Sequence, residues 1–261
     1  MVTKRDIHIS IVSHGQGRMV EYLLGDLAEL ACCLRLQVTL TKNLSEPNPF
    51  VVQKTPFPTL IIENKGPQGF GANHNAAFSQ APLPNERCYF IVVNPDVRVQ
   101  EDVLTPLVAM LEHDKETGIA APFVWSLSGK LEDSARYLPT PAGLFSKFFG
   151  QQGRWAADET EKYFQPDWVA GMFMGFRAEV FNDIGGFDEG YFLYYEDVDL
   201  CSRLWLKGFS VQVDSTISVI HDARRSSRRN LRYLIWHLAS IARFFSSDVY
   251  RQVKKLHSDR M

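Results

Sequence analysis

Several features that define other classes of protein are scarce in this chain or missing from it. It has 4 cysteines in 261 residues, and their spacing matches neither a metal-binding motif nor a disulfide framework. No apolar run approaches the roughly 20 residues that a membrane-spanning helix needs. The first residues lack the apolar core and cleavage site of a signal peptide. Internal repeats and low-complexity segments are absent as well. These absences favour a protein of the reducing cytoplasm without a transmembrane span.

What the chain does contain is an uneven distribution of charge, although the formal net charge is only −2. Residues 223–261 hold ten Lys or Arg and two Asp or Glu, whereas residues 1–222 hold 18 basic and 28 acidic residues. An acidic body suits the binding of cations, and a basic tail suits an anionic surface.

Short apolar segments alternate with helical patterns through the first half of the chain. Strands are predicted at 7–13, 37–41, 59–63 and 88–93, and helices at 17–34, 71–80 and 102–113. Strands that alternate with helices form a parallel sheet with right-handed crossovers. From about Gly118 the pattern loosens, and we expect short strands and turns that extend the sheet. The expected fold class is α/β, with one mostly parallel, Rossmann-like central sheet flanked by helices.

The last segment has a helical pattern of its own. Apolar residues recur at 231, 234, 235, 238, 241, 242 and 245, which predicts an amphipathic helix over 230–245. Such a helix can pack on the body or lie on an anionic lipid surface, and the sequence leaves both open. We expect one domain over 1–222, with halves over 1–115 and 116–222, followed by a basic helical tail over 223–261.

Polar residues follow the predicted strands of the first half. Ligands of parallel sheets bind beyond the carboxyl ends of the strands, so these residues are candidates for a binding site. They are Ser13, His14, Asn43, Asn64, Asn94 and Asp96. For Asp96, an ordinary Pro-Asp turn after a strand, without any function, would explain the same sequence.

The segment 64–75, NKGPQGFGANHN, combines three glycines with the predicted start of a helix. Glycines let a ligand approach the backbone, and the amides of a helix start can bind phosphate. The segment is not a dinucleotide-binding fingerprint, because a third glycine is missing and it follows the third strand instead of the first. An ordinary glycine turn remains an open alternative.

Carboxylates and aromatic residues are concentrated over 185–208, GGFDEGYFLYYEDVDLCSRLWLKG. Apolar residues at 198, 201, 204 and 205 predict a helix that begins at Glu196. Glu196, Asp197 and Asp199 then occupy its first turn, where the helix dipole stabilises negative charge. An acidic helix cap is the simplest reading. Three acids behind an aromatic run also suit proton transfer next to a bound sugar.

Together these segments resemble the motifs of inverting glycosyltransferases of family 2, which have the GT-A fold. The resemblance implies that Asp197 is the catalytic base and that Glu196 or Asp199 orients the acceptor or the base. It also implies that Asp96 binds a divalent metal, Mn²⁺ or Mg²⁺, with His221 as a second protein ligand. A lone histidine after a strand is more often structural, so the role of His221 as a metal ligand depends on the resemblance.

The resemblance and the strand ends together predict a site for a nucleotide-sugar donor. The predicted lining is Ser13, His14, Asn43, Asn64, Gly69, Gly71, Asn73, Asn75, Asn94, Asp96 and Gly171. An arginine in the position of Arg177 could steady a phosphate, although a surface arginine fits the sequence equally well. Two positions depart from the family pattern. Asn94 replaces an acid before Asp96, and the run 41–45, TKNLS, lacks the acid that holds the nucleotide base.

Within the family the motifs look most like those of bacterial rhamnosyltransferases that build O-antigen or related surface polysaccharides. This implies dTDP-L-rhamnose as the donor and a saccharide or polyprenyl-diphosphate-linked saccharide as the acceptor. It also implies a peripheral enzyme on the cytoplasmic face of the inner membrane, held through its basic tail, with no nucleic-acid partner. The alternatives are galactofuranosyl or another hexosyl transfer, an inactive carbohydrate-binding module, and a nucleotidyltransferase.

Overall fold

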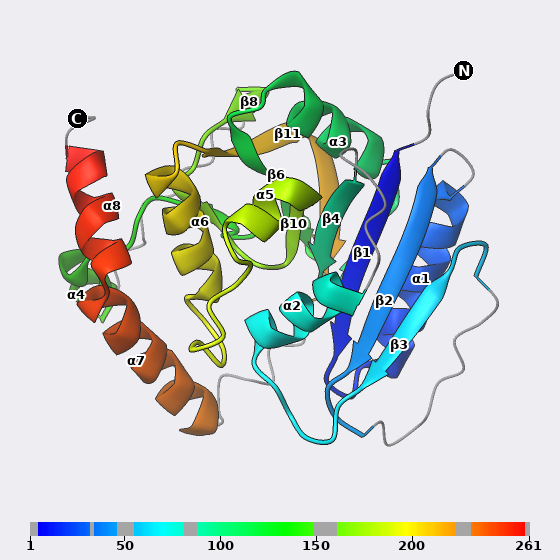
Figure 1. Ribbon diagram of the computed structural model, residues 1–261, viewed down its shortest axis with the longest axis horizontal. Helices are drawn as coiled ribbons and strands as arrows, with labels where there is room; N and C mark the ends of the chain where they lie inside the picture. The colour runs from blue at the N-terminus through cyan, green and yellow to red at the C-terminus, as the bar shows by residue number, and fades with distance from the viewer. Residues whose placement is uncertain are drawn as a thin grey trace.

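A mixed β-sheet runs through the protein and carries helices on both faces (Figure 1). The computed structural model describes residues 5–31, 34–45, 55–80, 88–148, 161–222 and 231–258. Two adjacent cysteines, Cys32 and Cys33, lie outside this range, and the other two are buried as free thiols. The expected α/β class with a mostly parallel central sheet and C-terminal helices is confirmed.

The first half of the sheet consists of parallel strands in the order β3-β2-β1-β4. The strands are β1 (Asp6–Ser13), β2 (Arg35–Lys42), β3 (Thr59–Glu63) and β4 (Cys88–Val93). The helices are α1 (Gly17–Leu30), α2 (Phe70–Gln80) and α3 (Leu104–His113). The elements predicted for this half are confirmed within a few residues at their ends, because their periodicity is strong and local.

The second half extends the sheet with short strands, as expected, and also with two long ones, β6 (Thr117–Ser126) and β11 (Ser210–His221), which were not expected. β10 (Phe173–Arg177) pairs antiparallel with β4 and with β6, and β6 pairs parallel with β11. Most of β6 is buried on both faces, so its sequence does not alternate. In β11 an irregularity in the register between Asp214 and Ser218 interrupts the pattern of side chains.

Smaller elements complete the second half. They are β5 (Val97–Arg98), β7 (Ala135–Arg136), α4 (Pro141–Phe148), β8 (Tyr163–Phe164), β9 (Trp168–Val169), α5 (Ala178–Asp183) and α6 (Glu196–Leu206). The tail forms two helices, α7 (Leu231–Ser246) and α8 (Asp248–Ser258). The predicted tail helix corresponds to α7, whereas α8 was not predicted. No helix in the described part of the chain is long and apolar enough to cross a membrane.

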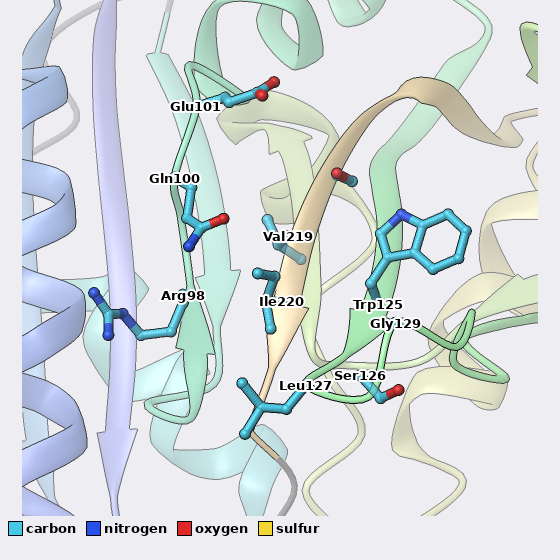
Figure 2. Close-up of a pocket in the computed structure, with 10 residues that line it drawn as sticks. Arg98, Gln100, Glu101, Trp125, Ser126, Leu127, Gly129, Val219 and Ile220 are labelled. Carbon is cyan, nitrogen blue, oxygen red and sulfur yellow. The ribbon is translucent and has the colours of Figure 1, made fainter.

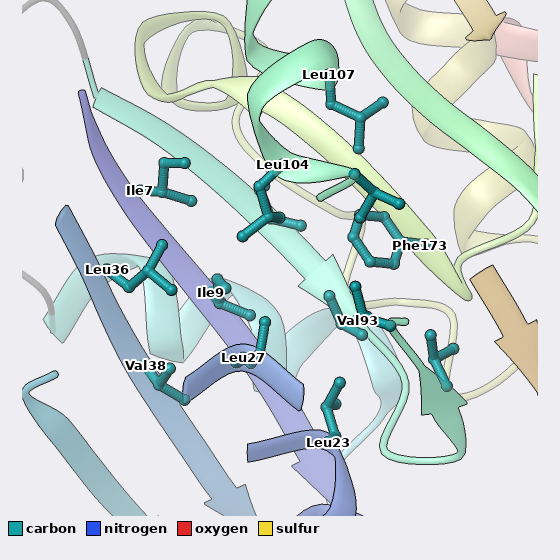
Figure 3. Close-up of a cluster of buried hydrophobic side chains, with 14 of the residues drawn as sticks. Ile7, Ile9, Leu23, Leu27, Leu36, Val38, Val93, Leu104, Leu107 and Phe173 are labelled. Atoms are coloured by element: carbon teal, nitrogen blue, oxygen red, sulfur yellow. The ribbon is translucent and has the colours of Figure 1, made fainter. Parts of the chain in front are cut away.

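The apolar core lies on both faces of the sheet. One cluster packs α1 and α3 against the sheet, with Ile7, Ile9, Leu27 and Leu104 among its members (Figure 3). The other cluster packs α5 and α6 against the opposite face. Fully burying one Leu, Ile or Phe side chain stabilises a fold by about 1.5–3 kcal/mol. The site therefore stands on a rigid base.

Strand β1 shows how the sequence produces this packing. Successive side chains of a strand point to opposite faces, so Ile7 and Ile9 enter one cluster while His8 and Ser10 face the other side. His8 Nε2 lies 2.8 Å from a threonine hydroxyl on β2, and Ser10 Oγ lies 2.8 Å from His74 Nδ1. Burial lowers the pKa of His8 to about 4 and that of His74 to about 3. Both histidines are therefore neutral members of the core at neutral pH.

Candidate active site

A network of amide side chains joins the carboxyl ends of β1, β2 and β3. Asn43 Oδ1 accepts hydrogen bonds from Gln68 N at 2.8 Å and from Asn64 Nδ2 at 2.7 Å. Asn43 Nδ2 donates to Gln68 O at 2.8 Å and lies 2.6 Å from His14 Nε2. Asn64 Nδ2 also donates to Asn73 Oδ1 at 2.7 Å. The network fixes the loop before α2 against the strand ends. Gln68, which the sequence analysis did not single out, is central to it.

Two members of the network, Asn43 and Asn73, are buried and hold the shape of the site from within. Asn43 is fully buried, and Asn73 is 2% exposed with its Nδ2 donating to Gly69 O at 2.8 Å. Ser13 supports the same corner, because its carbonyl accepts a hydrogen bond from Asn43 N at 2.9 Å. Direct contact of these residues with a nucleotide sugar stays a prediction.

Two of the three glycines of segment 64–75 lie against residues 187–195, which we call the acceptor loop because of the predicted role of this segment. A Cβ on Gly69 would lie 3.0 Å from backbone atoms of Phe192, and one on Gly71 would lie 2.5 Å from Phe187 Cβ. Phe70 N donates a hydrogen bond to Phe192 O at 2.9 Å. Glycine is required at both positions because two segments of this protein touch there. Their approach to a donor molecule stays a prediction.

Asn75 ties α2 to the other end of the acceptor loop. Its Nδ2 donates to Phe187 O at 2.9 Å and to Glu189 Oε1 at 3.0 Å, and its Oδ1 accepts from Phe187 N at 2.9 Å. A hollow of about 590 Å³ beside α2 is lined by Asn75 together with Asn64 and Asn73. None of the residues predicted to bind metal or to catalyse lines this hollow.

Asp96 and His221, far apart in the sequence, come together at the end of β11. The short strand β5 begins directly after Asp96 and pairs with the last residues of β11, which brings His221 Nε2 to 3.3 Å from Asp96 Oδ2. Burial lowers the pKa of His221, but the hydrogen bond and the charge of Asp96 outweigh it, and the net shift is upward.

The pair leaves two atoms whose chemistry suits a divalent cation. Asp96 Oδ1 and His221 Nδ1 are buried and have no hydrogen-bond partner. A carboxylate oxygen and an imidazole nitrogen are ligands that Mn²⁺ accepts, and Mg²⁺ accepts the oxygen. Among the described residues, no cluster of three or more His, Cys, Asp or Glu completes a metal cage. The oxygens of a diphosphate and water would therefore have to supply the remaining ligands.

The turn around Gly171 connects this pair with the predicted base. Asn94 N, on the loop that carries Asp96, donates to the carbonyl of Met172 at 2.9 Å. Gly171 N donates to Asp197 Oδ2 at 3.2 Å. The predicted metal ligand and the predicted base thus lie on two sides of a single turn.

Asp197 sits in the first turn of α6 and is held by the backbone. Its Oδ1 accepts a hydrogen bond from Val198 N at 2.8 Å, besides the bond of Oδ2 to Gly171 N. Burial raises the pKa of Asp197, while the two backbone bonds and the charge of Arg136 act in the opposite direction. An aspartate whose pKa is raised towards the working pH is better suited to accept a proton than an ordinary one.

Glu196, beside it, is buried with less support. It is 5% exposed, and its Oε2 has no hydrogen-bond partner. Burial and the charge of Asp197 raise the pKa of Glu196 well above its ordinary value. Two backbone N–H groups stabilise the charge of Asp197, whereas Glu196 has less support for its charge.

The backbone directly before these carboxylates is strained. Tyr194 and Tyr195 have φ angles of 71° and 66°, and they are the two non-glycine residues with positive φ in the described part of the chain. Such a conformation costs about 1–3 kcal/mol for each residue and persists where packing imposes it. Tyr195 is buried against Val198 and Phe244. No feature of the sequence indicates this strain, because tyrosine has no preference for positive φ.

Asp199 and Arg177 have partners within the protein. Asp199 forms a 2.7 Å ion pair with Arg203 on α6, and its role in orienting the acceptor or the base stays a prediction. For Arg177 the structure favours the alternative without a ligand. The Arg177 guanidinium donates to the carbonyls of Leu111 and Lys115, both at 2.7 Å. Because β10 runs antiparallel to β4, Arg177 pairs with Tyr89 near the start of β4. It therefore lies away from the carboxyl ends of the parallel strands, where the other predicted residues are.

A second hollow, of about 290 Å³, lies along the sheet beside β5 and β11 (Figure 2). Arg98, Gln100 and Trp125 border it, together with Ile220. Ile220 pairs with Arg98, and the next residue, His221, points to the other face of the sheet. None of the residues predicted for the site lines this hollow.

Comparisons with known proteins bear on this geometry. No protein-family model matches the chain. The chain is 26% identical over 259 residues to rhamnosyltransferase WbbL of Escherichia coli K12, a match that covers 92% of each protein. It is 27% identical over 244 residues to N-acetylglucosaminyl-diphospho-decaprenol L-rhamnosyltransferase of Mycobacterium tuberculosis H37Rv, covering 87% of this chain and 79% of that protein.

The solved structures agree on the fold. The mannosyltransferase PcManGT of Pyrobaculum calidifontis, solved with GDP-Man and Mn²⁺, matches 94% of this chain with a TM-score of 0.60 at 14% identity. The chain spans 66% of the length of PcManGT and 45% of another solved structure with this fold.

Fold and relatives together make this chain a glycosyltransferase with the GT-A fold. Its resemblance to family 2 is confirmed, and the two sequence relatives described above are named rhamnosyltransferases.

Proposed function

We propose that the protein is an inverting glycosyltransferase in which Asp197 is the general base. One observation carries the proposal. Asp197 is held by two backbone N–H groups at a strained helix start, across the Gly171 turn from the Asp96–His221 pair. The proposal is supported by this proton acceptor on one side of the turn and by the unpartnered Asp96 Oδ1 and His221 Nδ1 on the other.

In the proposed reaction, an acceptor hydroxyl attacks the anomeric carbon of the donor sugar from the face opposite the diphosphate. The new carbon–oxygen bond forms as the bond to the diphosphate breaks, so the configuration inverts. The hydroxyl proton passes to a carboxylate oxygen of Asp197, since each oxygen accepts one backbone bond and keeps another lone pair. A well-placed base contributes about 10²–10⁴-fold to the rate.

Asp96 and His221 would hold a divalent metal, Mn²⁺ or Mg²⁺, at the diphosphate. When bound, such an ion neutralises the negative charge of the leaving group. The proposal is supported by the two unpartnered ligand atoms of this pair and by the Mn²⁺ in the PcManGT structure. The buried amide network then keeps the donor-side loop in one shape.

We propose L-rhamnose, donated by dTDP-L-rhamnose, as the transferred sugar. The support is that both sequence relatives are named rhamnosyltransferases, and the mycobacterial one is named for a diphospho-decaprenol acceptor. By the same argument the acceptor is a polyprenyl-diphosphate-linked saccharide of a surface polysaccharide. The enzyme would then work at the cytoplasmic face of the inner membrane.

A panel of nucleotide sugars tests the function. The protein is incubated with each donor and Mn²⁺, with Mg²⁺, or with EDTA, and release of nucleoside diphosphate is measured. We expect metal-dependent release of dTDP from dTDP-L-rhamnose, lost in Asp197→Asn. Release from UDP-galactofuranose alone would move the protein to the galactofuranosyl alternative. Binding of saccharides without release from any donor would make it a carbohydrate-binding module.

A further inference from the structure

Helix α7 packs one face on the acceptor loop. Ser240 Oγ donates a hydrogen bond to Leu193 O at 2.9 Å, and the ring of Trp236 lies 4.5 Å from that of Phe192. Phe244 is fully buried in the cluster that surrounds the strained tyrosines. This face of α7 therefore supports the loop that leads directly into Glu196 and Asp197.

An ion pair adds to this contact. Arg243 Nη2 lies 2.8 Å from Asp188 Oδ2, and its guanidinium lies 5.1 Å from the centre of the Tyr191 ring. The loop is thus held at its beginning by Arg243 and further along by Ser240 and Trp236. A displacement of α7 would therefore shift most of the acceptor loop.

The opposite face of the same helix is apolar and exposed. Its residues recur at helical spacing of three and four, and with about 100° of rotation per residue they form one stripe opposite Ser240 and Phe244. They are Leu231 at 69%, Leu234 at 51%, Ile235 at 57% and Leu238 at 52% exposed. Four large apolar side chains side by side are a patch of the kind that marks an interaction surface.

Charge identifies the partner. Helix α7 has Arg232 and Arg243 and no acidic residue, and the whole segment 223–261 has ten basic and two acidic residues. An apolar stripe within a cationic segment is complementary to a bilayer that contains anionic lipid. A second copy of this chain would bring the same positive charge to the contact, which disfavours it.

We propose that Leu231, Leu234, Ile235 and Leu238 form a docking stripe that inserts into the surface of an anionic membrane. The other face of α7 then carries the acceptor loop and the two carboxylates close to that surface. If the proposed function holds, this position presents the base to a sugar whose diphosphate is anchored in the same bilayer. The stripe would recruit the enzyme to its acceptor without taking part in the chemistry.

Vesicle co-sedimentation tests the docking stripe. The full-length protein is mixed with vesicles of phosphatidylglycerol and phosphatidylethanolamine or of phosphatidylcholine alone. We expect binding to the anionic vesicles that weakens with salt, because exposed charges are screened over about 8 Å at physiological ionic strength. The double variant Leu234→Gln/Ile235→Gln should bind at least about tenfold more weakly, because two aliphatic side chains that would insert into the bilayer are lost.

Matched controls separate docking from folding. Ile61→Gln alters an exposed isoleucine on β3, on the other side of the molecule from α7 (Figure 1), and should bind like the parent. Ile235→Gln alone should give a partial loss. Circular dichroism and thermal unfolding of each variant show whether the fold is kept, and donor hydrolysis in solution should be unchanged.

The outcomes are distinct. Equal binding of parent and double variant to anionic vesicles would overturn the proposal. Absence of vesicle binding, together with a dimer in the ultracentrifuge that the double variant dissociates, would make the stripe a contact between copies. Vesicle binding that depends on the stripe, without nucleotide release from any donor, would keep the docking surface and refute the proposed function.

Discussion

The two sides of the candidate site are built in opposite ways. On the donor side, neutral amides at the strand ends satisfy one another, with Asn43 fully buried and four polar contacts within 2.8 Å. On the acceptor side, Glu196 is buried and Asp197 is half-buried, both have raised pKa values, and they follow two residues with positive φ.

The difference suggests that one side of the site maintains its shape and the other holds its reactive groups. A buried network with every partner satisfied favours one conformation and resists change. Buried carboxylates at a strained backbone are costly on their own and persist because the surrounding packing imposes them. In the proposed function the donor side is therefore a fixed cradle, and the acceptor side holds the groups that react.

The largest expected effect comes from removing the proton acceptor. Asp197→Asn keeps the shape of the side chain, so donor affinity should stay the same while the transfer rate falls by about 10²–10⁴-fold. Steady-state kinetics and a donor-binding titration measure the two quantities. Glu196→Gln serves as the comparison and should lose less. A loss below tenfold in Asp197→Asn would mean that another group is the base.

Removing an amide should act on stability instead. Asn43→Ala removes the acceptor of Gln68 N and of Asn64 Nδ2 and the donor to Gln68 O, and we expect a loss of about 2–4 kcal/mol in the free energy of unfolding. Urea titration measures it. Asn182→Ala, at an exposed site, should stay within about 0.5 kcal/mol of the parent. If both variants were equally stable, the network would not hold the donor side.

The next effect concerns metal-dependent binding at Asp96, one of the two predicted metal ligands. Asp96→Asn should lower the Mn²⁺-dependent affinity for dTDP by about 10–100-fold or more, because a charged ligand is lost. Calorimetric titrations with and without Mn²⁺ separate this from metal-independent binding. The neighbouring Asp222→Asn is the charge control and should retain the metal dependence. Unchanged metal dependence in Asp96→Asn would remove this residue from the metal site.

We expect the free energy of unfolding to depend on pH through Glu196. Because the folded state raises the pKa of Glu196, it binds that proton more tightly than the unfolded chain does. Stability from this group is present at low pH and is lost as the pH rises from about 4.3 through the raised pKa. Glu196→Gln lacks this loss, so its stability relative to the parent should increase with pH, by up to about 1.4 kcal/mol per unit. Unfolding curves at acid and alkaline pH measure the difference, and a constant difference would contradict it.

The smallest effect concerns the strained backbone. Both Tyr194→Gly and Tyr194→Ala remove the ring, but glycine tolerates positive φ, so the glycine variant should be more stable by about 1 kcal/mol. At Tyr22 in α1 the same pair should give the reverse order by about 0.5–1 kcal/mol. Denaturant midpoints of the four variants measure both differences. The same order at both positions would argue against strain at Tyr194.

The sequence by itself determined the local elements and the class. The alternation of Ile7, His8, Ile9 and Ser10 specifies which side of β1 faces each half of the core. The spacing after Glu196 specifies the start of α6, and the motif order specifies the resemblance to glycosyltransferases. These features depend on residues that are neighbours along the chain, so periodicity reveals them.

Only the tertiary structure decided which of these residues meet. His221 reaches Asp96 because β5 pairs with the end of β11, whereas Arg177 is carried away from the carboxyl ends of the parallel strands because β10 runs antiparallel. Tyr194 and Tyr195 adopt their positive φ angles where α7, a later helix of the chain, packs against them. Contacts between distant segments depend on how whole elements pack, and that information is not contained in any local pattern.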